Sequence, residues 1–176
     1  MNLPNQLTLL RVILIPVCLA LWALGQPAWA AAVFIFAAIT DFLDGYIARK
    51  RHIVTVFGKF ADPVADKLLV LTAMIFLTAD GRIPAWAVCV VAARELMVDG
   101  LRLVAVGKGN VIAAGWLGKI KTNLQYFCVV SAMLLEKGHW LTLALAVAMA
   151  VLTVWSGAQY FRASRDVFRE NQGEGN

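Results

Sequence analysis

Long apolar runs follow one another along nearly the whole chain, and they restrict its fold more than any other feature. A helix needs roughly 20 mostly apolar residues to cross a bilayer. About six candidate spans meet this length, at 7–24, 28–48, 62–78, 84–106, 118–135 and 141–161. The pattern predicts an all-α polytopic membrane protein with about six transmembrane helices, in a single domain over residues 1–176. Glycine, proline or polar residues punctuate the connections, among them Gly25, Gly58, Gly81 and Gly138.

Composition agrees with a membrane protein and narrows its partners. The chain is 61% hydrophobic and 15% charged, whereas soluble domains average about 45–50% and about 25%. A net charge of +5 in so apolar a chain favours anionic lipid headgroups or phosphorylated substrates as partners. We expect no nucleic-acid partner. Three widely spaced cysteines without a CxxC pair argue against a disulfide framework or a zinc site.

The distribution of lysine and arginine predicts the orientation in the membrane. The basic cluster at 49–51 and the arginines of the C-terminal tail fall on the side of the N-terminus, whereas only Arg82 and Lys137 fall on the other side. By the positive-inside rule both termini are cytoplasmic. We expect the first run to be a retained span rather than a signal peptide, since no charged residue precedes Arg11.

Four aspartates lie inside the second and third runs, where ionised side chains are rare and usually functional. Asp41 and Asp44 are three residues apart, and Asp62 and Asp66 are four apart, so each pair shares one helical face. A short basic loop joins the two runs and makes them antiparallel neighbours. The cytoplasmic ends of these two helices can therefore bring all four carboxylates together.

Four clustered carboxylates repel one another unless a cation lies between them. Carboxylate oxygens suit hard cations such as Mg²⁺, and two such ions can assist an in-line phosphoryl displacement. The small residues Gly45, Ala48 and Gly58 would let the helices pack closely or admit a flat ligand. The alternative is that the aspartates form structural ion pairs with neighbouring bases: Arg49, Lys59 or Lys67.

The complete pattern DxxDG-xx-AR-x8-G-xxx-D-xxx-D resembles the signature of the CDP-alcohol phosphatidyltransferases. The positions that match are Asp41, Asp44, Gly45, Ala48, Arg49, Gly58, Asp62 and Asp66. The resemblance implies a membrane enzyme that acts on a CDP-linked lipid with Mg²⁺ or Mn²⁺, two ions in all, and that forms a homodimer.

The same resemblance assigns a role to each matched residue. It implies that Asp41, Asp44 and Asp62 hold the metal ions, and that Asp66 can complete the coordination of the second ion and is also the general base. Residues near the CDP group would be Gly45, Ala48 and Gly58, with Arg49 at its phosphates. Residue types and spacing alone do not separate the base from the metal ligands.

A second group of charges lies in the fourth run and at the start of the fifth. Glu95, Asp99 and Arg102 share one helical stripe that Arg94 borders, and Lys119 follows in the next run. Arginine binds phosphate through forked donors and lysine as a point charge, so Arg94, Arg102 and Lys119 predict a site for a phosphate of the acceptor. The alternative is internal neutralisation of these arginines by Glu95 and Asp99, with Lys121 on the surface.

Three further segments, PNQLTLLR, ARELMVDGLR and GKIKT, resemble the branch of the family formed by bacterial phosphatidylglycerophosphate synthases. This resemblance implies sn-glycerol 3-phosphate as the acceptor, held by Arg94, Arg102 and Lys119. It also implies that Thr8 and Arg11 face the same cavity and that Asn5 lies near the nucleotide. The alternatives are a helix cap for Thr8 and an interfacial anchor for Arg11.

The prediction is therefore a bacterial inner-membrane enzyme with its active site in a cytoplasm-facing cavity. It transfers the phosphatidyl group of CDP-diacylglycerol to glycerol 3-phosphate and releases CMP. Other acceptors stay open, namely inositol phosphate, serine or phosphatidylglycerol. An intramembrane cation transporter or a prenyltransferase would also place carboxylates inside a membrane.

Overall fold

The chain folds into long helices. The computed structural model describes residues 3–51, 56–107 and 116–163, and the side chains within them except at 3–5, 41–51, 56–62, 107, 119 and 163. These ranges contain six helices: α1 (Leu3–Ala23), α2 (Pro27–Arg51), α3 (Val56–Ala79), α4 (Ala85–Gly107), α5 (Trp116–Leu134) and α6 (Trp140–Ala163). The prediction of an all-α chain with six long helices is confirmed.

The start of α3 corrects one detail of the prediction. The helix begins at Val56, whereas the apolar run suggested a start at residue 62. Gly58, which we expected to break the chain between two helices, therefore lies inside α3. A single glycine costs a helix only about 1 kcal/mol relative to alanine, so the polar first turns can remain helical.

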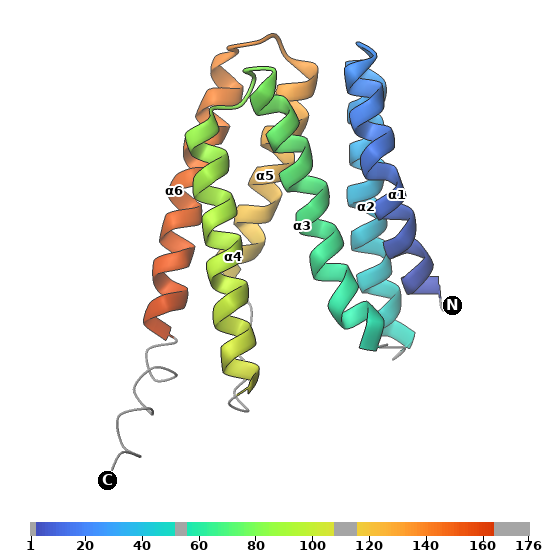
Figure 1. Cartoon of the computed structure of the whole chain (residues 1–176), viewed down its shortest axis with the longest axis vertical. Coiled ribbons are helices and arrows are strands. Elements are labelled where there is room, and N and C mark those ends of the chain that lie inside the picture. Colours follow the sequence, from blue (N-terminus) through green and yellow to red (C-terminus); the bar gives the residue numbers. More distant parts are fainter. Residues whose placement is uncertain (1–2, 52–55, 108–115, 164–176) are drawn as a thin grey trace.

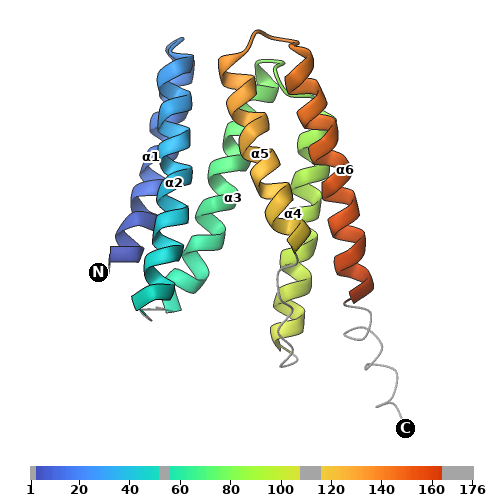
Figure 2. The ribbon, with the colours of Figure 1, turned by 180° about the vertical axis from the view of Figure 1, so that it is seen from behind.

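The helices are arranged around α3. In Figure 1, α1 and α2 run side by side on one side of α3, and α4, α5 and α6 lie on the other. The view from behind in Figure 2 shows the same order, and α3 contacts α1, α2, α4 and α5. The first turn of α1 and the last turn of α6 point to the same end of the bundle (Figure 1), as the sequence predicted for chain ends on one side.

Glycines form the tight turns at the opposite end. Gly25 and Gly81 have φ angles of 71° and 69°, a conformation that residues with a Cβ rarely adopt. The amide of Gly81 donates to the carbonyl of Thr78, and the amide of Arg82 donates to that of Leu77. This pair of bonds is the Schellman motif that ends many helices, and Gly25 ends α1 in the same way.

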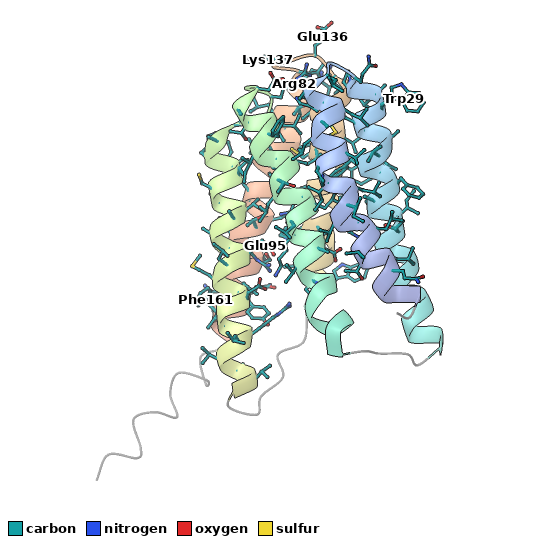
Figure 3. All side chains as sticks on the ribbon, turned by 45° about the vertical axis from the view of Figure 1, so that its right-hand side comes forward. Trp29, Arg82, Glu95, Glu136, Lys137 and Phe161 are labelled. Carbon is teal, nitrogen blue, oxygen red and sulfur yellow. The ribbon has the colours of Figure 1, made fainter. Side chains whose placement is uncertain are left out.

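Arg82 joins three parts of the chain at this end of the bundle, beside the turn that carries Glu136 and Lys137 (Figure 3). Its Nη1 donates to the carbonyls of Ala132 and Leu135, at 3.1 and 2.6 Å. Its guanidinium lies 4.9 Å from the centre of a Trp22 ring. The single arginine thereby connects α1, the α3–α4 turn and the end of α5.

Buried side chains fill the space between the helices, and apolar side chains also cover much of the outside. Phe34, Met74 and Val129 are fully buried, whereas Leu96 and Leu103 on α4 are 72% and 76% exposed. Monomeric soluble proteins rarely expose broad apolar faces. Within the described residues, two helical stretches are long and apolar enough to cross a membrane, Gln6–Ala23 and Trp140–Arg162. Spans for the other helices stay a prediction.

Candidate active site

The four aspartates lie on two neighbouring helices. Asp41 and Asp44 are on the C-terminal part of α2, and Asp62 and Asp66 are on the N-terminal half of α3. The two helices contact each other. The members of each pair are three or four residues apart, and this spacing places them on one face of their helix. The side chains of Asp41, Asp44 and Asp62 lie outside the described part. So do those of the other predicted nucleotide-site residues: Asn5, Gly45, Ala48, Arg49 and Gly58.

Asp66 is paired with an arginine from α1. Nη1 of Arg11 donates to Oδ1 of Asp66 at 2.5 Å. The Arg11 side chain is completely buried, whereas that of Asp66 is 31% exposed. The alternative of Arg11 as an interfacial anchor is wrong, because an anchor would extend into the aqueous boundary. Instead, Arg11 places a positive charge directly beside the carboxylate that the family resemblance assigns as the base.

Thr8 lies one turn before Arg11 on the same helix and is 2% exposed. The helix begins at Leu3, so Thr8 belongs to its second turn. The alternative of Thr8 as a helix cap is therefore wrong, since a cap precedes the first turn. The burial of Thr8 agrees with the prediction that this face of α1 looks inward.

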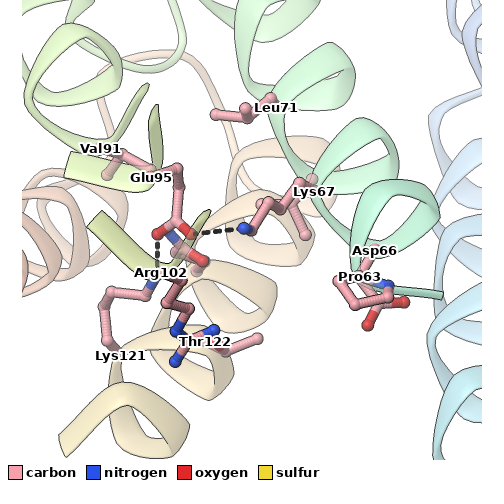
Figure 4. Close-up of a pocket in the computed structure, with 11 residues that line it drawn as sticks. Pro63, Asp66, Lys67, Leu71, Val91, Glu95, Arg102, Lys121 and Thr122 are labelled. Atoms are coloured by element: carbon pink, nitrogen blue, oxygen red, sulfur yellow. Dashed lines mark hydrogen bonds and ion pairs between the residues drawn. The ribbon is translucent and has the colours of Figure 1, made fainter. Parts of the chain in front are cut away.

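A cavity of about 160 Å³ lies between α3, α4 and α5. Its lining combines apolar side chains with Asp66, Lys67, Glu95, Arg102 and Lys121. Figure 4 shows Asp66 and Lys67 leaving α3 in different directions, although they are consecutive in the chain. The cavity thus connects the predicted base with a group of cationic side chains on the other side of α3.

Glu95 is the centre of this cationic group. Its Oε1 accepts a hydrogen bond from Nζ of Lys121, and its Oε2 lies 3.9 Å from Nζ of Lys67 (Figure 4). Nη1 of Arg94 lies 3.4 Å from the same Oε1. Asp99, one turn further along α4, pairs with Lys67. The side chains of Glu95 and Lys121 are only 10% and 4% exposed, so these charges interact with little screening by water.

Lys121 corrects an alternative that the sequence left open. That alternative placed Lys121 on the surface. In the structure the residue is 3% exposed and donates a hydrogen bond to Glu95. Lys67, which was considered only as a structural partner for the aspartates, belongs to the same group. The acids Glu95 and Asp99 are therefore paired mainly with two lysines, and Arg94 is a further, more distant partner of Glu95.

Arg102 faces the cavity with a different kind of partner. Its Nε donates to the hydroxyl of Tyr160 on α6 at 2.8 Å, and its guanidinium carbon lies 5.3 Å from the centre of the Tyr160 ring. Among the side chains that the structure describes, no carboxylate lies within ion-pair distance of Arg102. Within the described part of the chain, this arginine is thus a cation without a counterion.

Arg94 and Lys119 are the other two residues predicted to bind the acceptor phosphate, and only the side chain of Arg94 is described. Arg94 lies against α6, where a methyl group added at Gly157 would approach its Cγ to 3.3 Å, and it is absent from the cavity lining. It reaches the cationic group only through Glu95. The side chain of Lys119 lies outside the described part. Of the two members of the trio whose side chains are described, Arg102 lines the cavity and Arg94 does not.

Sequence reasoning missed Lys67 and Lys121 as cavity residues, and it missed Tyr160. A signal for Lys121 was available, because Gln125 lies one helical turn further on α5 and lines the same cavity. Two polar residues at a spacing of four inside an apolar run indicate an inward polar face. Nothing in the sequence of α6 connected Tyr160 with Arg102, since 58 residues separate them.

The residues that could hold a metal ion are the four aspartates. Among the described side chains no group of three or more His, Cys, Asp or Glu residues could do so, and three of the four aspartates fall outside that set. The donor set itself fits a hard divalent cation, because it consists of carboxylate oxygens from two helices in contact.

Comparison with known proteins gives one consistent result. The sequence profile of the CDP-alcohol phosphatidyltransferases matches residues 1–155. A CDP-diacylglycerol–glycerol-3-phosphate 3-phosphatidyltransferase of Bacillus subtilis is 44% identical, over 91% of this chain and 93% of the relative. Proteins with the same name from Salmonella choleraesuis and Escherichia coli are 41% and 40% identical, each over 93% of this chain and 95% of the relative.

Proposed function

This chain belongs to the CDP-alcohol phosphatidyltransferase family, and from that premise we propose its reaction. It transfers the phosphatidyl group of CDP-diacylglycerol to sn-glycerol 3-phosphate, giving phosphatidylglycerol phosphate and CMP. The observation that carries this proposal is the identity of 40–44%, over more than nine tenths of the chain, to bacterial relatives named for this activity.

Asp41, Asp44, Asp62 and Asp66 would hold two divalent ions, Mg²⁺ or Mn²⁺. The support is the chemistry of four carboxylates at helical spacing on two contacting helices, together with a family that uses a divalent metal. Such ions, when bound, neutralise the charge of the diphosphate group. The small residues Gly45, Ala48 and Gly58 would leave space for the cytidine, with Arg49 and Asn5 near its polar groups.

Asp66 would act as the general base. Its carboxylate borders the cavity and is partly exposed, so an acceptor hydroxyl can approach it. The buried guanidinium of Arg11 fixes the orientation of the carboxylate through a hydrogen bond at 2.5 Å.

The phosphate of the acceptor would lie in the cavity on the other side of α3. Arg102 offers it a guanidinium without a carboxylate partner among the described residues, while Lys67 and Lys121 add positive charge nearby. Arg94 and Lys119, which the sequence also predicts to bind this phosphate, are the remaining members of the proposed site. A volume of about 160 Å³ suits a small phosphorylated alcohol better than a lipid headgroup with its chains.

The proposed chemical step follows from these positions. With its phosphate beside Arg102, the acceptor presents its terminal hydroxyl to Asp66, which takes the proton. The hydroxyl oxygen forms a bond to the phosphorus of the phosphatidyl group, and the bond from that phosphorus to the CMP oxygen breaks. CMP leaves with the bonding electron pair, and the product stays in the membrane through its acyl chains.

The proposed setting is the bacterial inner membrane, with six spans, both termini and the active site on the cytoplasmic side, and a homodimer as the assembled form. The excess of lysine and arginine toward the N-terminal side supports this orientation. So do the first turn of α1 and the last turn of α6, which point to one end of the bundle.

The test is an acceptor panel with purified protein in detergent micelles that contain CDP-diacylglycerol and Mg²⁺. CMP release is measured with glycerol 3-phosphate, serine, inositol phosphate or phosphatidylglycerol. We expect glycerol 3-phosphate to give by far the highest kcat/KM, and EDTA to abolish the reaction until Mg²⁺ or Mn²⁺ is restored. A higher kcat/KM with another acceptor, or no CMP release with any of them, would contradict the proposal.

A further inference from the structure

The contact between Arg102 and Tyr160 extends the proposed acceptor site to the last helix. We infer that Tyr160 is a positioning residue that orients the guanidinium of Arg102 for the acceptor phosphate. This inference rests on the proposed function, because it concerns the same cavity. It assigns a role to a residue that lies beyond the stretch, 1–155, matched to the family as a whole.

The hydrogen bond determines which part of the guanidinium is available. Tyr160 accepts from Nε of Arg102 at 2.8 Å, and the two terminal nitrogens donate to no other described side chain or backbone carbonyl. An arginine binds phosphate best through two parallel N–H donors in a fixed plane. With Nε occupied, the edge formed by Nη1 and Nη2 is the pair that remains for a phosphate.

The aromatic ring holds the guanidinium in place from a second direction. The guanidinium carbon lies 5.3 Å from the ring centre, within the range of a cation–π contact. Tyr160 itself is 8% exposed and packs with Val98 and Leu101 of α4, so it has little freedom to move. A flexible arginine side chain thereby becomes a preorganised donor, which lowers the entropy lost when the acceptor binds.

Arg102 has no carboxylate partner among the side chains that the structure describes, and this leaves its charge available to a ligand. A carboxylate beside Arg102 would compete with the acceptor phosphate for the same donors. A tyrosine hydroxyl is neutral, so it fixes the side chain and leaves its full positive charge to the ligand. Lys67 and Lys121, by contrast, each pair with a carboxylate of α4.

The test compares Tyr160→Phe with the wild-type enzyme in the CMP-release assay. Phenylalanine keeps the ring and removes the hydroxyl, so we expect KM for glycerol 3-phosphate to rise about three- to tenfold. We expect kcat, KM for CDP-diacylglycerol and the melting temperature to stay close to wild type. Ser156→Ala is the matched control, since it removes another buried hydroxyl of α6 that bonds only the carbonyl of Thr153.

A double-mutant cycle separates positioning from a structural role. Arg102→Lys keeps the charge and removes the guanidinium fork, so adding Tyr160→Phe in that background should change KM by less than about twofold. An unchanged KM in Tyr160→Phe alone, or the same rise in both backgrounds, would overturn the inference. Failure of the proposed function is distinguishable, because it would appear as wild-type protein without CMP release from glycerol 3-phosphate.

Discussion

Asp66 and Lys67 are neighbours in the chain, yet their side chains belong to two regions with opposite charge. Asp66 turns toward α1, where buried Arg11 holds it, and the predicted clustering of the aspartates of α2 and α3 would make this the acidic region. Lys67 turns toward α4 and joins Lys121 and Arg102 around the cavity. On this prediction α3 is the boundary between an acidic and a basic region.

The difference between the regions lies in which charges the protein leaves without a counterion. In the basic region Glu95 and Asp99 neutralise the two lysines, whereas Arg102 has no carboxylate partner among the described side chains. An excess of negative charge suits cations and an excess of positive charge suits a phosphate. The comparison therefore predicts that the acidic region governs kcat and that the basic region governs KM for the acceptor.

Asp66→Asn should have the largest effect and would test the acidic region. An amide oxygen still accepts the bond from Arg11 but cannot take a proton, so kcat should fall by about 10²–10⁴-fold. KM for glycerol 3-phosphate should change little, which steady-state CMP release can show. A kcat near that of the wild type would remove Asp66 from the role of base.

Glu95→Gln should have the next largest effect, a loss of stability. The change leaves Lys121, which is 4% exposed, without its counterion, so the free energy of unfolding should fall by about 3–5 kcal/mol. Thermal denaturation in detergent measures this loss. The control is Asp80→Asn, which breaks an exposed pair with Arg82 and should cost at most about 1 kcal/mol; equal losses in both would contradict the prediction.

Arg102→Gln tests whether the basic region binds the acceptor. Loss of a charged donor should weaken acceptor binding by about 1.5–3 kcal/mol, which is about a 10- to 100-fold rise in KM for glycerol 3-phosphate. The matched control is Lys137→Gln, which removes an exposed charge at the other end of the bundle and should leave KM unchanged. If Arg102→Gln lowered kcat alone, the division of roles between the two regions would be wrong.

Gly157→Ala should have the smallest effect. The added methyl group would lie 3.3 Å from Cγ of Arg94, and the flexible arginine can move by a few tenths of an ångström. We expect a change in KM for the acceptor below about threefold and a loss of stability below about 1 kcal/mol. A tenfold rise in KM would show that Arg94 takes a direct part in acceptor binding.

Much of the fold could be predicted from the sequence, because the signals are local. Long apolar runs indicated helices, and the glycines at positions 25, 81 and 138 indicated turns. The described residues contain six helices. The four aspartates were predicted to lie on α2 and α3, where they do lie. Their clustering, like the membrane spans of the middle helices, stays a prediction.

The pairing within the site could not be predicted, since it depends on how distant helices rotate against each other. Arg11 was expected to face the acceptor cavity, and only the structure shows its contact with Asp66. Lys121 on α5 could pair with either of two acids of α4, Glu95 or Asp99. Only the packing of the helices shows that Glu95 is its partner. Glu95 and Asp99 lie about one turn apart on the same face of α4, so a shift of this helix along its axis by about 6 Å would exchange these partners.

The contact between Arg102 and Tyr160 also has a consequence for the order in which the site is completed on the ribosome. All four aspartates and Arg11 have been translated once α3 is finished at Ala79. Arg102 gains its partner only when translation has passed residue 160, in the last helix. A nascent or truncated chain that ends before α6 would contain every residue proposed for the chemical step, but not the one that orients the arginine for the acceptor.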